Sequence, residues 1–175
     1  MCSSDLPDLI GQFGMPMGPI ELADQVGLDI CLAVGDMLRS KFGDSLPPTP
    51  AWLRDKVANG ELGRKTGKGF YVWKDGKADK GSGATAAAAP TAEMIDRLVL
   101  PMSNVCVACL REGIVDNADV VDGAMIFGTG YAPFRGGPLK YARSRSVDNV
   151  TATLRALAAK FGDRFTPDAG WETFE

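Results

Sequence analysis

The sequence predicts an all-α protein built from two related helical modules in tandem. The same Gly-Pro segment occurs twice, at Gly18-Pro19 and at Gly137-Pro138. The longest apolar segments repeat their large side chains every three or four residues, which is the period of one helix face. Only the run Phe70-Tyr71-Val72-Trp73 has the aromatic and β-branched character of a strand.

The two copies align over more than the Gly-Pro pair. Gly18–Asp24 aligns with Gly137–Arg143 at an offset of 119 residues, and Asp8–Gly14 aligns with Asp122–Gly128 at an offset of 114. The second copy therefore has five extra residues in the loop before its Gly-Pro. It also begins with a long apolar segment, residues 94–115, for which the first copy has no counterpart in this sequence. We therefore expect the first copy to be truncated at its N-terminal side.

The first module is expected to begin with two helices. Pro19 suits a first helical turn and Gly27 a stop, which predicts a helix over Ile20–Val26. A second helix is predicted over Leu28–Phe42, with Gly43 as its C-cap. Its apolar residues share one face, which we expect to be buried: Ile30, Ala33, Val34, Met37 and Leu38.

The rest of the first module is predicted to contain one short helix, followed by a linker. Thr49 is predicted to be the N-cap, and Pro50 the first turn, of a helix that ends near Ala58. Residues 74–92 contain little apolar bulk and are predicted to form a mobile linker. The expected organisation is a first module over residues 8–73, a linker over 74–92 and a second module over 93–175.

The second module is expected to be helical almost throughout. Its long apolar segment, residues 92–115, has large side chains on most of its circumference, which indicates a buried helix, and Pro101 inside it indicates a kink or a first turn. Shorter helices are predicted over residues 120–127 and 139–142, and a long one over 147–161 that ends at Gly162. A last turn starts at Thr166-Pro167-Asp168 and carries Trp171.

Composition excludes several functions. The net charge of −3 disfavours a broad nucleic-acid surface, and no apolar run approaches the length that spans a bilayer. The start of the chain lacks the pattern of a signal peptide, so we expect a cytoplasmic protein with reduced thiols. The chain has no histidine, which removes the commonest general base and most zinc sites.

The basic, glycine-rich segment Gly63–Gly69 is similar to a phosphate-binding loop, with differences. It is one residue short between its glycines, lacks the final Ser or Thr, and precedes a strand-like run rather than a helix. We favour a basic turn that enters a strand. The alternative is a solvent-facing lysine cluster that contacts a phosphorylated ligand.

Two further patterns have plain structural interpretations. Cys106 and Cys109 form a C-x-x-C in the middle of an apolar helix, where core packing is more plausible than redox chemistry or zinc binding. Glu21 and Asp24 are interpreted as part of a solvated helix face, although a general-base role stays open. No G-x-G-x-x-G follows a predicted strand, so we expect no dinucleotide-binding fold and assign no cofactor-binding residues to this chain.

The segment Met15-Pro16-Met17-Gly18-Pro19 is the best candidate for contact with a substrate. It is a stiff, apolar turn at a helix N-terminus, and methionine suits an aliphatic chain of variable shape. We propose Met15, Pro16, Met17, Gly18 and Pro19 as substrate-proximal residues. The alternative is a corner that serves packing alone.

Three segments together carry a family resemblance. Residues 13–29, FGMPMGPIELADQVGLD, and residues 63–71, GRKTGKGFY, resemble the C-terminal domain of 3-hydroxyacyl-CoA dehydrogenases. Leu98–Gly137 resembles a second copy of it, and tandem copies are typical of the alpha subunit of the multifunctional fatty-acid oxidation complex. The resemblance implies the helical fold shared with the C-terminal domain of 6-phosphogluconate dehydrogenase.

The resemblance also implies a reaction, the NAD-dependent oxidation of L-3-hydroxyacyl-CoA in fatty-acid β-oxidation. In the family a His–Glu pair, a Ser and an Asn act on the substrate. All four would precede residue 1, so no catalytic residue is assigned to this chain. The place that resembles the family's Asn-Arg in the second copy is Asp96-Arg97, which indicates a structural role there.

The expected function is thus the substrate-side and oligomerisation part of a dehydrogenase and enoyl-CoA hydratase multifunctional enzyme. NAD would bind the full-length protein but not this chain alone, which we expect to be inactive in isolation. A second copy of the protein or a thiolase subunit is the implied partner, with no nucleic acid, metal or membrane span. The alternative is a non-catalytic helical interaction module that shares the fold.

Overall fold

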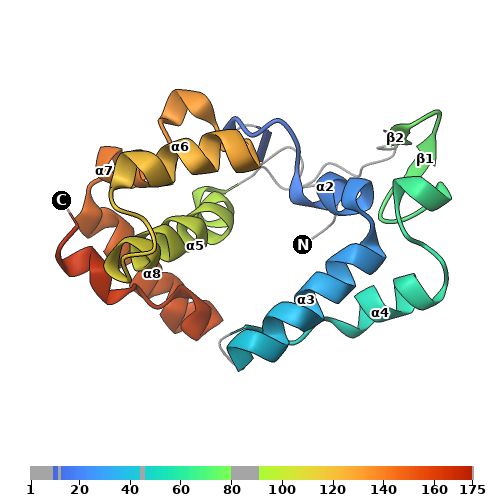
Figure 1. The fold of residues 1–175 in the computed structure, drawn as a ribbon, viewed down its shortest axis with the longest axis horizontal. Coiled ribbons are helices and arrows are strands. Elements are labelled where there is room, and N and C mark those ends of the chain that lie inside the picture. Colours follow the sequence, from blue (N-terminus) through green and yellow to red (C-terminus); the bar gives the residue numbers. More distant parts are fainter. Residues whose placement is uncertain (1–9, 12, 44–45, 80–90, 175) are drawn as a thin grey trace. The chain divides into compact units, whose positions relative to one another are not determined.

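A computed structural model describes residues 10–11, 13–43, 46–79 and 91–174 (Figure 1). These residues form two compact units. The first unit contains residues 10–11 and 17–79, and the second contains residues 91–174 together with residues 13–16. Residues 13–16 therefore pack with the second unit, although the sequence placed them in the first module.

The first unit is mainly helical, and the last of its described elements form a small hairpin (Figure 1). Its elements are α2 Pro19–Val26, α3 Leu28–Phe42, α4 Ala51–Ala58, the 3₁₀ turn η2 Arg64–Thr66, β1 Val72–Lys74 and β2 Lys77–Asp79. Pro19 occupies the first turn of α2, and Gly27 and Gly43 are the C-caps of α2 and α3. The predicted bounds of these two helices are confirmed to within one residue.

The predicted cap of α4 is wrong. Pro50, not Thr49, is the N-cap residue, and no side chain caps the helix. The Thr49 hydroxyl instead donates to Asp36 Oδ1 at 2.8 Å, and Arg54 donates to both oxygens of the same carboxylate. Thr49 and Arg54 thus connect α4 to α3 through Asp36.

The hairpin replaces the beginning of the predicted linker. β1 pairs antiparallel with β2, with Val72 opposite Asp79 and Lys74 opposite Lys77. Asp75 and Gly76 form the two-residue turn with φ of 50° and 74°, the left-handed pair that a tight hairpin requires. An Asp-Gly pair after a strand-like run is a hairpin signal, so β2 could have been predicted from the sequence. Residues 80–90 of the predicted linker lie outside the described residues.

The predicted buried stripe of α3 is not buried. Leu28 is the buried residue of this helix, whereas the stripe is exposed: Ile30, Ala33, Val34, Met37 and Leu38. α4 packs on α3 through the side that carries Asp36. The period predicted the helix correctly, but nothing among the described residues of this unit covers the apolar face.

The second unit is an assembly of helices and short 3₁₀ turns (Figure 1). Its elements are α5 Ala92–Arg111, α6 Ala118–Thr129, η3 Pro133–Arg135, α7 Pro138–Ser144, α8 Val147–Phe161, η4 Asp163–Phe165 and η5 Ala169–Glu172. Side chains of Thr91, Asn117 and Ser146 cap α5, α6 and α8 by accepting from backbone N–H groups. The predicted bounds of α8 are confirmed, α6 and α7 are longer than predicted, and α5 ends four residues earlier.

The core of the second unit forms where α5 packs on α7, α8 and η5. The buried members of the core are Leu100, Cys106, Val107, Val121, Leu139, Ala142, Val150, Leu154 and Trp171. Pro101 lies inside α5, after its first turns, and Val105 is 63% exposed. The prediction that α5 is buried nearly all round is therefore wrong, because the helix is buried along one side only.

One helix pair has the same plan in both units. α2 and α7 each begin with a proline after a glycine N-cap, at Pro19 and Pro138. α3 and α8 are both 15 residues long and both end at a glycine, Gly43 and Gly162. All of these positions differ by the offset of 119 residues found in the sequence.

Candidate functional site

The proposed substrate-proximal segment leads into the first turn of α2. Gly18 is buried and is the N-cap of α2, with φ −74° and ψ 155°, and it has no side chain to cap the helix. Pro16 and Pro19 are exposed, whereas Met15 and Met17 are half-buried. Met15 and Pro16 belong to the second unit and residues 17–19 to the first.

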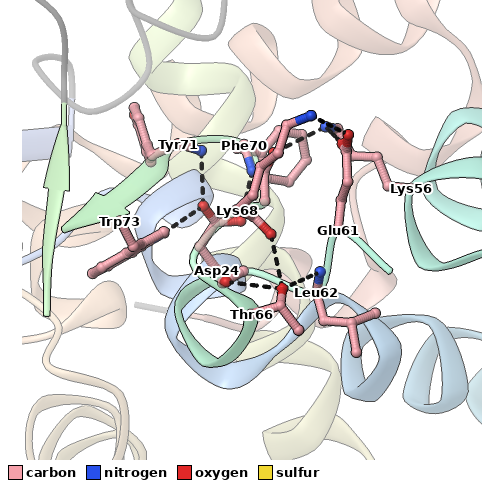
Figure 2. A network of polar contacts seen from close by, with 11 residues as sticks. Asp24, Lys56, Glu61, Leu62, Thr66, Lys68, Phe70, Tyr71 and Trp73 are labelled. Carbon is pink, nitrogen blue, oxygen red and sulfur yellow. Dashed lines mark hydrogen bonds and ion pairs between the residues drawn. The ribbon is translucent and has the colours of Figure 1, made fainter. Parts of the chain in front are cut away.

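The interpretation of Asp24 as part of a solvated face is wrong. Its exposed fraction is 0%, and its carboxylate accepts three hydrogen bonds, as Figure 2 shows. Phe70 N donates to Oδ1 at 2.8 Å, and Tyr71 N and Trp73 Nε1 both donate to Oδ2 at 2.9 Å. A buried carboxylate is tolerated only when such donors replace water. Glu21, in the first turn of the same helix, is only half-buried.

The glycines of the basic segment serve this contact. A Cβ on Gly63 would overlap the backbone of Asp24, and a Cβ on Gly69 would overlap the Asp24 carboxylate. Gly63 also has a φ of 96°, a backbone conformation that residues other than glycine rarely adopt. The two glycines are therefore explained by the approach of α2, without a phosphate.

The lysines of the same segment are engaged within the unit. Lys65 binds both carboxylate oxygens of Asp29 at 2.5 and 2.6 Å. Lys56 and Lys68 both pair with Glu61, and hydrogen bonds from Lys56 and then Lys68 lower the pKa of Glu61 to about 2 (Figure 2). Because these cations already have carboxylate partners, the structure favours the basic turn over the phosphate-contacting cluster.

The second unit has a buried carboxylate of its own. Asp122 accepts from Leu139 N at 2.7 Å and from Lys140 N at 2.9 Å, at the start of α7. Gly137, with φ 105°, leaves the space that Asp122 occupies. Burial raises the pKa of Asp122, while these backbone hydrogen bonds oppose that shift.

Asp96, at the position that resembles the family's Asn, makes a structural contact. Asp96 is buried and forms an ion pair with Arg145, which also donates to Tyr141 Oη and to Asn149. Arg97 stacks on Phe161 with its guanidinium carbon 4.0 Å from the ring centroid. Both side chains therefore hold α5 against α7 and α8.

The cysteines do not form a redox or metal site in the described part of the chain. Cys106 is buried, and burial raises the pKa of its thiol to about 12, opposite to the shift that activates a thiolate. No group of metal-binding side chains occurs among the described residues. Within those same residues, no helix combines the length and apolarity needed to cross a bilayer.

A hollow of about 480 Å³ lies in the second unit, between the start of α8 and the C-terminal segment. Thr151 and Arg155 line it from α8, and Pro167 and Trp171 line it from the other side. Asp168, also in its lining, is bound to Arg111. No pattern in the sequence predicted this hollow.

Comparison with known proteins agrees with the resemblance. Residues 5–73 match the family model described as 3-hydroxyacyl-CoA dehydrogenase, C-terminal domain. The fatty acid oxidation complex subunit alpha of Shewanella amazonensis is 36% identical over 168 residues, which cover 90% of this chain and 24% of that protein. The subunit of the same name from Vibrio campbellii is 37% identical over 165 residues, covering 90% of this chain and 23% of that protein.

Solved structures agree on the fold. A 3-hydroxybutyryl-CoA dehydrogenase from Escherichia coli superposes with a TM-score of 0.71 at 20% identity, over 96% of this chain and 54% of that one. The dehydrogenase part of multifunctional enzyme 1 from C. elegans has a TM-score of 0.70 at 21% identity, and the match covers 100% of this chain and 42% of that one.

The fold is thus the helical one of 3-hydroxyacyl-CoA dehydrogenase C-terminal domains. Residues 5–73 are therefore similar to a 3-hydroxyacyl-CoA dehydrogenase C-terminal domain, and 90% of the chain is similar to part of fatty acid oxidation complex alpha subunits. The chain spans about a quarter of the length of the curated relatives it matches.

Proposed function

We propose that this chain is the substrate-side and oligomerisation part of an NAD-dependent L-3-hydroxyacyl-CoA dehydrogenase of the multifunctional, enoyl-CoA hydratase type. The observation that carries the proposal is the similarity of 90% of the chain to fatty acid oxidation complex alpha subunits at 36% identity. In this proposal the hydride acceptor NAD binds a dinucleotide-binding domain that these 175 residues do not contain.

We further propose that the chain holds two tandem copies of the helical domain. The shared plan of α2–α3 and α7–α8, at one offset of 119 residues, supports this. The first copy faces the substrate through Met15–Pro19, whose apolar turn suits an acyl-pantetheine chain and whose helix N-terminus suits a thioester oxygen. The exposed apolar residues of α3 support the proposal that another subunit covers this surface, either a second molecule of this protein or a thiolase subunit.

A chimera tests the proposal. The segment of the Shewanella amazonensis subunit that matches this chain is replaced by residues 1–175, and NADH formation from a 3-hydroxyacyl-CoA is measured. We expect turnover by the chimera and none by the 175-residue chain alone. An inactive chimera that is folded and binds NAD would instead favour a non-catalytic interaction module that shares the fold.

Gly18→Val in the active chimera tests the substrate-facing turn. The added side chain blocks close approach of the backbone to the ligand, so KM for hydroxyacyl-CoA should rise about tenfold, or about 1.4 kcal/mol. KM for NAD should stay nearly unchanged. If the variant only melts at a lower temperature while the kinetics of the folded protein are intact, the turn is a packing corner.

A further inference from the structure

The carboxylate of Asp24 is the most completely buried acidic group described in the first unit, and the proposed function gives it no role. It lies on α2, the helix whose first turn follows Gly18. Its two oxygens accept from two backbone N–H groups and one indole N–H, all between Phe70 and Trp73. A short helix is thereby tied to a loop 46 to 49 residues further along the chain.

The segment that precedes these donors, residues 62–69, is attached to the junction of α2 and α3 at two more points. Leu28 N donates to the carbonyl oxygen of Leu62 at 3.2 Å, and Lys65 forms an ion pair with Asp29 at the start of α3. Gly63 and Gly69 admit α2 at a distance that no larger residue allows. These contacts hold the second half of α2, so the position of its first turn follows from them.

The geometry points to Asp24 as a positioning residue for the acyl-CoA side of the site. This inference rests on the proposed function, because it requires the turn at Met17, Gly18 and Pro19 to face substrate. Asp24 itself touches no substrate. It sets the position of α2, and small displacements of a substrate-contacting element have large kinetic effects.

The decisive variant is Asp24→Asn in the active chimera. Asparagine keeps one oxygen but turns an amide N–H₂ toward donors, because both carboxylate oxygens of Asp24 are occupied by N–H groups. We expect KM for hydroxyacyl-CoA to rise about fivefold or more, with KM for NAD and kcat within about twofold of the unchanged chimera. In the 175-residue variant, the indole N–H resonance of Trp73 should shift.

Asp122→Asn is the matched control. Asp122 is also buried and also accepts backbone N–H groups on both oxygens, so its loss costs comparable stability, but it lies in the second unit. It should lower the melting temperature and leave both KM values unchanged. If Asp24→Asn does not fold, Trp73→Phe removes one donor only and should raise the same KM by a smaller factor.

The outcomes separate the two proposals. An active chimera in which Asp24→Asn keeps the wild-type KM, or in which Asp24→Asn and Asp122→Asn raise it equally, overturns the positioning role alone. A chimera without activity removes the proposed function and this inference together.

Discussion

α3 and α8 are helices of the same length that bury very different surfaces. α8 buries Val150, Thr151, Leu154 and Leu157 against the rest of its unit, whereas the buried residue of α3 is Leu28. Leu38 and Leu157 occupy equivalent positions at the offset of 119 residues, yet Leu38 is 37% exposed and Leu157 3%. Equal periodicity therefore gave equal helices but not equal burial, because burial needs a partner such as α5.

The solvent-facing residues of the two helices also differ: α3 has large apolar residues where α8 has polar or small ones. Where α3 carries Ile30, Val34 and Met37, α8 has Asn149, Thr153 and Ala156. Polar and small residues suit solvent, whereas a stripe of large apolar residues is typical of an interaction surface. This difference supports the proposal that another element covers α3.

The largest effect expected from this comparison comes from a matched pair of substitutions. Leu157→Ala should destabilise the second unit by about 2–5 kcal/mol, because the side chain is buried. Leu38→Ala should cost about 1 kcal/mol or less, since much of that side chain already contacts water. Urea titrations of both variants followed by circular dichroism measure the difference. Equal losses would show that α3 is packed as tightly as α8.

A smaller effect is expected from acid. α3 is held partly by ion pairs: the hydrogen bond from Arg54, then that from Thr49, lowers the pKa of Asp36, and the hydrogen bond from Lys65 lowers the pKa of Asp29. A folded-state pKa below the ordinary 3.8 means that the stabilisation is complete above that value and is lost as the pH falls through the lowered one. α3 should therefore loosen in acid before α8.

Amide exchange at about pH 5 and about pH 3, corrected for intrinsic rates, measures this loosening. Asp36→Asn is the control, since it should remove part of the acid dependence of α3 and leave α8 unaffected. Loosening of α8 first would be the opposite of the expected order.

The sequence predicted local structure better than it predicted partners. Pro19, Gly27, Gly43 and Gly162 set helix ends correctly because caps act through neighbouring backbone. The buried Asp24 could not be anticipated, since its donors lie about 46 residues away and short polar residues on a helix are usually solvated. The proposed site residues Met15–Pro19 stay a prediction, because their meaning depends on a ligand.

Hydrogen exchange of the 175-residue chain tests the central claim, the unequal burial of two equivalent helices, most directly. Protection of a helix reports the free energy needed to open it, so amides of Leu28–Phe42 should exchange faster than those of Val147–Phe161. The sample should be monomeric, which sedimentation can verify, because self-association would cover α3. Equal protection of the two helices in a monomer would contradict the account.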